Sequence, residues 1–172
     1  SHGGVRMKDL DTPNEKAVQK GMPNIEHLIS VIKSFGLPVV VSINQFPSDT
    51  PRELAIVQSG AEDAGAQAAV LSRGFTHGGN GMIDLAEAVV SATKGHQPEI
   101  SYLYPSDYTA EEKVLSLAQK VYGASDVEWS TAAKDRLKDI YYHGWDKLPI
   151  CMAKTHLSIS HNPKLKARPS GY

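Results

Sequence analysis

One aromatic ring beside a proline is the first feature of this chain that is suited to binding a ligand. Phe46 and Pro47 lie in a polar loop that directly follows residues 39–43, a run rich in β-branched side chains. A rigid ring at the end of a buried strand suits a flat heterocycle, because ligands bind beyond the carboxyl ends of such strands. The alternative is a phenylalanine that packs against the following helix, and the loop alone favours this packing role.

The glycine-rich residues 74–81 are predicted to form a loop, which is the second candidate and contains another ring, Phe75. Its backbone N–H groups, for example at Gly78 and Gly79, can hold an anion when a helix begins just after them. The two phenylalanines are expected at neighbouring strand ends, where two facing rings can clamp a planar heterocycle. The alternative is a flexible glycine loop with one anchoring ring, and the segment alone leaves both open. Neither the phosphate-loop pattern nor the dinucleotide fingerprint occurs in the sequence.

A lysine, Lys154, follows the apolar residues 149–153 and gives the third candidate. A lysine at the end of a strand can bind a phosphate or a carboxylate. The alternative, a buried strand whose polar tail meets solvent, is favoured without further observations. Cys151 lies inside the apolar run and is expected in the core rather than as a nucleophile.

The histidines and the cysteine do not form a metal-binding motif. The seven histidines are scattered without the spacing of a helical zinc site, and one cysteine cannot complete a thiolate cage. We therefore expect no structural zinc. The glycine-x-serine-x-glycine elbow of serine hydrolases is also missing, and no general base is identified, so the catalytic residues stay unknown.

An α/β scaffold is expected to bring the candidate segments together. Apolar spacing and turn signals predict helices over 14–35, 51–64, 82–93, 109–122 and 130–142, strands over 38–43, 67–72 and 148–153, and a short strand candidate at 100–104. Gly21 and Pro23 are expected to break the first helix into a short and a longer one. Successive strand–helix–strand units predict parallel strands joined by a right-handed crossover. The expected fold class is α/β, a Rossmann-like three-layer arrangement in which helices flank a mostly parallel sheet, with an irregular C-terminal tail from residue 155.

The composition is that of an ordinary globular chain. Of the 172 residues, 41% are hydrophobic and 22% are charged, which allows a real core. The net charge of −1, without a basic cluster, argues against nucleic-acid binding, and no apolar run is long enough to span a bilayer. We expect a strand–helix–strand–helix subdomain over 1–98 and a smaller α/β subdomain over 99–172. Both ends look like cuts through a longer protein.

Several strings along nearly the whole chain, taken in order, resemble those of one enzyme family. They are HGG at 2–4, FGLPVVV at 35–41, INQFPSDT at 43–50, GGNG at 78–81, VYGA at 121–124, LPICMAKT at 148–155 and LSISHNP at 157–163. The CMAKT string is highly specific. By these strings the chain resembles formate–tetrahydrofolate ligase, also called formyltetrahydrofolate synthetase.

The resemblance implies an enzyme of one-carbon metabolism that joins formate to tetrahydrofolate at the expense of ATP. In this family formate is phosphorylated to formyl phosphate, and a folate amine then attacks it to give 10-formyltetrahydrofolate. The phosphate-binding loop of the family lies in an N-terminal part that is not in this chain, so ATP with its magnesium is expected to bind mostly elsewhere. The chain resembles the later, folate-binding part and is expected to be inactive alone.

The resemblance also assigns residues to the folate site. Phe46 and Pro47 fall on the folate-contacting loop of the family, together with the preceding Asn44 and Gln45. Phe75 falls where bacterial members usually carry tryptophan, so the ring is kept but its stacking face is smaller. Gln45 replaces a residue that is commonly basic. The anion-binding candidates remain Gly78, Gly79 and Lys154.

Two other functions remain open from the sequence: a non-catalytic module that binds folate or another planar ligand, and a structural or interaction fragment. The expected partners are the small molecules tetrahydrofolate, formate and ATP, rather than nucleic acid or a membrane. The parent is either a stand-alone ligase or part of a larger folate enzyme, and a homo-oligomeric parent is one option. We expect a cytoplasmic location, with the mitochondrion and the plastid as alternatives.

Overall fold

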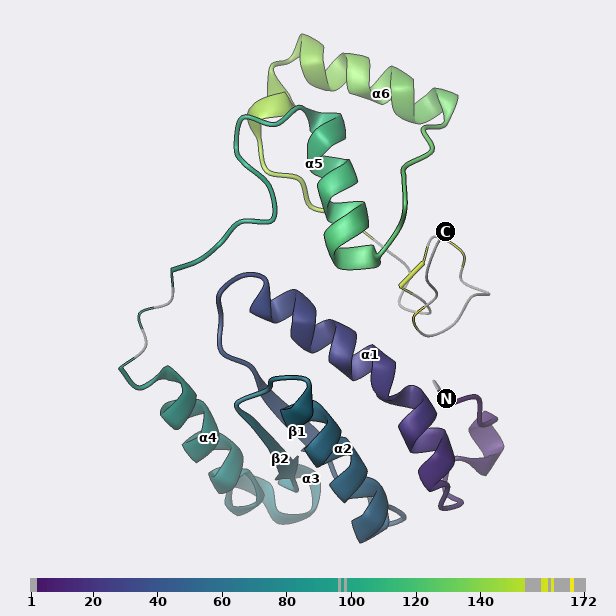
Figure 1. The fold of residues 1–172 in the computed structure, drawn as a ribbon, viewed down its shortest axis with the longest axis vertical. Helices are drawn as coiled ribbons and strands as arrows, with labels where there is room; N and C mark the ends of the chain where they lie inside the picture. Colours follow the sequence, from purple (N-terminus) through teal and green to yellow (C-terminus); the bar gives the residue numbers. More distant parts are fainter. Residues whose placement is uncertain are drawn as a thin grey trace. The chain divides into compact units, whose positions relative to one another are not determined.

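The computed structural model describes residues 3–95, 97, 99–153, 159, 160, 162 and 168. The chain divides into two compact units, Ser1–Ser101 and Tyr102–Tyr172, and each unit has helices of its own (Figure 1). Within the described residues, no helix combines the length and the apolar character needed to cross a membrane.

The first unit is an α/β arrangement around two parallel strands. Its elements are η1 (Met7–Asp9), α1 (Glu15–Lys33), β1 (Val40–Asn44), α2 (Pro51–Asp63), β2 (Ala68–Ser72), α3 (Gly74–His77), η2 (Gly78–Met82) and α4 (Ile83–Thr93). In the parallel pair, Val40 lies opposite Ala68 and Asn44 lies opposite Ser72. The predicted α/β class and the parallel pair are confirmed.

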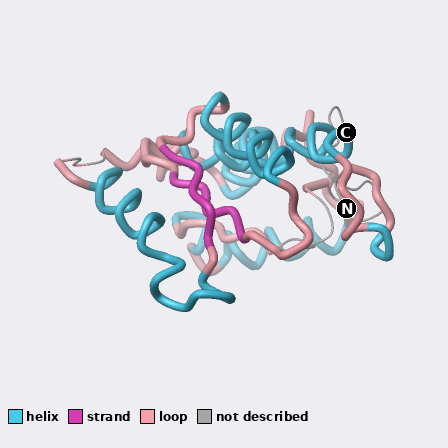
Figure 2. The backbone as a smooth tube through the Cα atoms, turned by 90° about the horizontal axis from the view of Figure 1, so that it is seen from below, coloured by secondary structure: helices cyan, strands magenta, loops and turns pink. Residues whose placement is uncertain are grey.

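Helices cover both faces of the strand pair, as a three-layer arrangement requires. Figure 1 shows α4 on one side of the strands and α1 with α2 on the other, and Figure 2 shows the two strands running side by side between helices. The core on the α1 and α2 side consists of Ile29, Val39, Ala61, Ala66 and Ala69. Because three of these five residues are alanines, α2 and the strands can approach closely.

The first helix corrects one prediction, because α1 is continuous and Pro23 lies inside it. A proline in a helix interior loses one N–H bond and costs about 3 kcal/mol. Packing compensates here: Met22 is buried against α2, where a Cβ on Gly60 would lie only 2.5 Å from its Cε atom. The Asn24 side chain also donates to the Gly21 carbonyl at 3.2 Å. The predicted break at Gly21 and Pro23 is wrong because tertiary packing outweighs the local signal.

The glycine-rich segment 74–81 is helical rather than an open loop. It forms α3 and most of the 3-10 helix η2, and the Arg73 N–H closes it by donating to the Gly81 carbonyl at 3.0 Å. A Cβ on Gly81 would lie 2.5 Å from the Arg73 carbonyl oxygen, so this close approach needs glycine. The prediction of a loop is therefore wrong in conformation, although the segment does connect β2 to α4.

The second unit contains helices but no strand among its described residues. α5 (Ala110–Leu117) continues into the π-helical turn η3 (Ala118–Tyr122), and α6 (Thr131–Tyr142) is followed by the 3-10 helix η4 (Trp145–Lys147).

Three predictions for this region are wrong. The segments 100–104 and 148–153 are irregular rather than strands, and Cys151 is exposed rather than in the core. Backbone groups of the second segment bond to side chains, as when the Ile150 N–H donates to the Tyr104 hydroxyl at 2.9 Å. The irregular tail expected from residue 155 lies almost entirely outside the described residues.

Candidate functional site

The predicted site lies where the two strands end. Asn44 and Ser72 are the last residues of β1 and β2 and pair with each other, so the segments that follow leave the sheet side by side. The Gln45 N–H extends the ladder by donating to the Ser72 carbonyl at 3.1 Å. Phe46 and Phe75 therefore follow neighbouring strand ends, at the edge where open α/β sheets bind ligands.

The backbone of Phe46 is held in a tight turn, while its ring is left in solvent. Its N–H donates to Asp49 Oδ2 at 2.7 Å, and the Asp49 N–H donates back to the Phe46 carbonyl at 3.0 Å. This pair of bonds encloses Pro47, which is exposed, and Phe46 itself is 63% exposed. The packing role that the loop alone favours is therefore not the one observed.

Phe75 lies in α3 and is fully exposed, with a relative accessibility of 102%. Burying a phenylalanine side chain stabilises a protein by about 1.5–3 kcal/mol, so an exposed ring forgoes that energy. Phe46 and Phe75 together leave apolar area at one edge of the sheet that a ligand can cover.

Arg73, which the sequence interpretation missed, connects the two strand ends. Its Nε donates to Gln45 Oε1 at 2.7 Å. Arg73 and Gln45 are the first residues after β2 and β1, so the register that pairs Asn44 with Ser72 brings them together. The signal in the sequence was a basic residue directly after a strand, but only the strand register shows which residue it reaches.

A hollow of about 410 Å³ lies beside Arg73 and along β2. Its lining residues are Gln58, Ala69, Val70, Leu71, Arg73, His77, Asn80, Gly81 and Asp84. Gln58 Nε2 donates to the Ala69 carbonyl at 3.0 Å, and His77 Nδ1 lies 2.7 Å from the Thr76 hydroxyl. The lining combines an apolar strand with amide, imidazole, guanidinium and carboxylate groups, so the hollow suits a polar and flexible part of a ligand.

The remaining predicted residues contribute less to this geometry. Asn44 is exposed at the end of β1, and Gly78 and Gly79 are exposed in η2. Neither of these two glycines lines the hollow, which includes Gly81 instead. Lys154 lies outside the described residues. An anion-binding role for Gly78, Gly79 and Lys154 stays a prediction.

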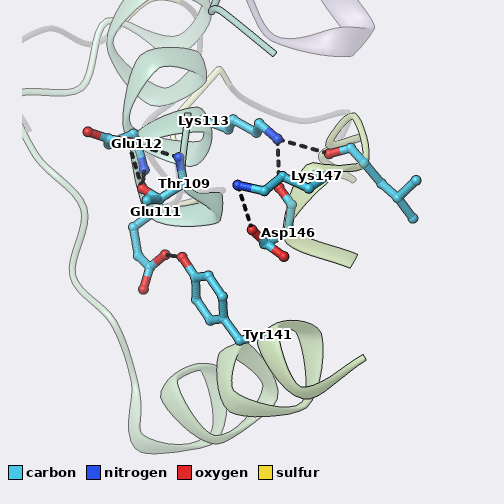
Figure 3. A network of polar contacts seen from close by, with 8 residues as sticks. Thr109, Glu111, Glu112, Lys113, Tyr141, Asp146 and Lys147 are labelled. Carbon is cyan, nitrogen blue, oxygen red and sulfur yellow. Dashed lines mark hydrogen bonds and ion pairs between the residues drawn. The ribbon is translucent and has the colours of Figure 1, made fainter. Parts of the chain in front are cut away.

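In the second unit, a buried lysine holds the segment that leads to Cys151. Lys113 is 1% exposed, and its Nζ donates to the carbonyls of Asp146 at 2.7 Å and Leu148 at 3.3 Å (Figure 3). The Asp146 carboxylate pairs in turn with Lys147 at 3.1 Å. In the described part of the chain, no buried side-chain polar atom lacks a hydrogen-bond partner. The network therefore positions backbone and leaves no buried group free for a ligand.

Two groups shown in Figure 3, Glu112 and Tyr141, have shifted pKa values. Bonds from the Thr109 N–H and hydroxyl, each 2.8 Å long, lower the pKa of Glu112, with the N–H as the larger cause. The hydrogen bond that Tyr141 donates to Glu111 raises the pKa of Tyr141 (Figure 3). Both shifts favour the protonation state already present at neutral pH, so neither group is a candidate acid or base there.

Known proteins resemble this chain along its length. The sequence profile described as "Formate--tetrahydrofolate ligase" matches residues 1–172. The chain is 45% identical over 163 residues to the formate–tetrahydrofolate ligase of Roseiflexus castenholzii. The matched residues make up 95% of this chain and 29% of the relative. The chain is 41% identical over 171 residues to that of Thermotoga maritima, and 39% identical over 172 residues to that of Methylobacterium nodulans, covering 99% of this chain and 31% of each relative. The chain thus spans about 30% of the length of these relatives.

Proposed function

The chain belongs to the formate–tetrahydrofolate ligase family, and we propose that it forms the tetrahydrofolate-binding part of such a ligase. The observation that carries this proposal is the pair of exposed rings, Phe46 and Phe75, at strand ends that are paired in register. A pterin is a flat heterocycle, and an aromatic contact contributes about 0.5–1.5 kcal/mol beyond the area it buries. Pro47 restricts the Phe46 turn, and Asn44 and Gln45 offer amide groups beside it.

The reaction proposed for the whole ligase proceeds through formyl phosphate. ATP transfers its terminal phosphoryl group to formate, which gives formyl phosphate and ADP. An amine of tetrahydrofolate then attacks the formyl carbon, phosphate leaves, and the amine loses a proton to give 10-formyltetrahydrofolate. The residues of this chain bind and orient the acceptor. Holding the amine beside the acyl phosphate accelerates the reaction by proximity, because the entropy cost of encounter is met on binding.

ATP and the magnesium ion that accompanies it are proposed to bind mostly outside this chain. No segment has the phosphate-loop pattern, and no three metal-ligating side chains gather among the residues that the structure describes. We therefore assign no step of the reaction to a metal held by these residues. The isolated chain is proposed to lack ligase activity, and turnover of formate, ATP and tetrahydrofolate by the chain alone would contradict this.

Titration of the chain with tetrahydrofolate in a calorimeter tests the binding proposal. Phe46→Ala and Phe75→Ala should each weaken binding by about tenfold, because each removes one stacking face. Tyr102→Ala is the matched control, since Tyr102 is 82% exposed but belongs to the second unit. Failure of the wild-type chain to bind, or an equal loss in all three variants, would favour a structural fragment instead.

A further inference from the structure

We propose that Arg73 makes this site specific for the glutamyl tail of tetrahydrofolate, by binding a tail carboxylate with its guanidinium group. The inference rests on the proposed function, because it takes Phe46 and Phe75 as the place of the pterin. Tetrahydrofolate joins its pterin through an aminobenzoyl group to glutamate, so one ligand carries a flat ring and a distant anion. The rings and Arg73 would then contact different parts of the same molecule.

The guanidinium of Arg73 is oriented but not neutralised. Its Nε donates to Gln45 Oε1 at 2.7 Å, and its backbone N–H is fixed by the Gly81 carbonyl at 3.0 Å. Gln45 is neutral, and Arg73 forms no ion pair with any residue in the described part of the chain. The Nη1 and Nη2 groups are therefore free to donate, and their planar fork matches the two oxygens of a carboxylate.

The hollow beside Arg73 has room for the tail. Its volume of about 410 Å³ lies in the usual range for small-molecule sites, and His77 and Asn80 add polar groups to its wall. Asp84 also lines the hollow and repels an anion. A tail carboxylate should therefore lie at the Arg73 side, and removing the Asp84 charge should tighten its binding.

A phosphate group also suits a guanidinium, but the surroundings favour a carboxylate. Asp84 lines the same hollow, and its repulsion of a doubly charged phosphate is about twice that of a singly charged carboxylate. The phosphoryl chemistry is also proposed to lie mostly outside this chain. Because Arg73 is exposed, its contribution is expected to be modest, about threefold to tenfold in affinity, and to weaken as salt is added.

Binding affinities for three ligands distinguish the contribution of the glutamyl tail from that of the pterin ring. The ligands are tetrahydropteroate, which lacks glutamate, and tetrahydrofolate with one or with several glutamates. Wild-type affinity should be higher for both glutamylated ligands. Arg73→Gln should remove that gain, about threefold to tenfold, and leave affinity for tetrahydropteroate unchanged. Asp84→Asn should increase the gain. The matched control is Lys94→Gln, which removes a positive charge at the C-terminal end of α4, away from the strand ends.

The outcomes distinguish this inference from the proposed function. If Phe46→Ala weakens all ligands while Arg73→Gln weakens all equally or none, the inference is overturned and the proposed function stands. If inorganic phosphate competes only when Arg73 is present, and glutamate makes no difference, the anion is phosphate and the inference is again overturned. Absence of any Phe46-dependent binding overturns both. Thermal unfolding checks that Arg73→Gln is folded, and Arg73→Lys, which keeps the charge, should recover part of the gain.

Discussion

The two units hold their irregular segments in opposite ways. In the first unit, backbone bonds between paired strand ends fix the chain, and Phe46, Arg73 and Phe75 are left exposed. In the second unit, side chains hold the backbone: Lys113 binds two carbonyls, and the Tyr104 hydroxyl accepts a backbone N–H. The first unit therefore leaves two rings and a cation exposed, whereas in the described part of the second unit Lys113 and Tyr104 use their polar groups internally.

Lys113→Met should have the largest effect on the free energy of unfolding. If it had no effect, side chains would not hold the backbone of the second unit as the comparison states. The variant leaves two carbonyl partners without a charged donor in a buried position, so we expect a loss of about 3 kcal/mol. Urea unfolding followed by tryptophan fluorescence measures it, because Trp129 and Trp145 both lie in the second unit. Lys138→Met is the control, since its exposed pair with Asp135 should change stability by less than about 0.5 kcal/mol.

Gly81→Ala tests the corresponding statement for the first unit, that backbone geometry fixes its strand ends. The added Cβ would lie 2.5 Å from the Arg73 carbonyl oxygen, which cannot rotate away, so we expect a loss of about 2 kcal/mol. Gly79→Ala is the matched control, because nothing lies within 4 Å of a Cβ built there. Thermal unfolding by circular dichroism should separate the two variants, while tryptophan fluorescence should not change. Equal stability of both variants would show that the turn adapts.

The fold of the first unit could be predicted because its signals are local. The strands predicted over 38–43 and 67–72 lie within two residues of β1 (Val40–Asn44) and β2 (Ala68–Ser72). A β-branched run between proline and a polar loop needs no distant information to be read as a strand. The apolar run 148–153 gave a similar signal, but a strand also needs a partner. Its backbone groups bond instead to Lys113 and Tyr104, which no local pattern reveals.

The same restriction to local signals explains which residues of the candidate site could be predicted and which could not. Phe46 and Phe75 were found because each ring follows a predicted strand, and parallel strands end at one edge. Their exposure was not predictable, because the loop around Phe46 alone favours packing and the segment around Phe75 leaves both roles open. Arg73 was missed because its contact with Gln45 depends on the register of Asn44 with Ser72, a long-range property.

Each unit contains a helix that begins with a capping box, and the two boxes allow a test with a smaller expected effect. Glu53 accepts the Asn14 N–H at 2.7 Å as well as both donors of Thr50, whereas Glu112 accepts only the donors of Thr109 within the described residues. These bonds lower the pKa of both glutamates, and the Asn14 N–H is the largest cause for Glu53.

Lowering the pH should therefore reduce the free energy of unfolding of the two units by unequal amounts. A glutamate whose pKa is lowered on folding stabilises the protein above its usual pKa of 4.5, and this contribution is lost as pH falls through the folded value. Glu53→Gln should reduce the loss of stability of the first unit at acid pH by less than about 1 kcal/mol, since the carboxylate is only partly buried and solvent screens it. Glu112→Gln should reduce the loss of stability of the second unit at acid pH by a smaller amount. Tryptophan fluorescence follows the second unit alone, and circular dichroism follows the helices of both units, so comparing the two signals gives the change in the first unit. Equal changes in the two units would show that the Asn14 bond contributes nothing.

The smallest expected effect concerns the size of one exposed ring. Phe75→Trp enlarges the stacking face without displacing any neighbour, because Phe75 is fully exposed, and should tighten tetrahydrofolate binding by about threefold. Tyr102→Trp is the control from the second unit and should leave the affinity unchanged. The variant also places an indole in a unit that has none, so ligand contact should quench its fluorescence directly. If neither Phe75→Trp nor Phe75→Ala changes binding, Phe75 does not touch the ligand, and exposure of a ring at a strand end does not by itself distinguish the binding unit from the other.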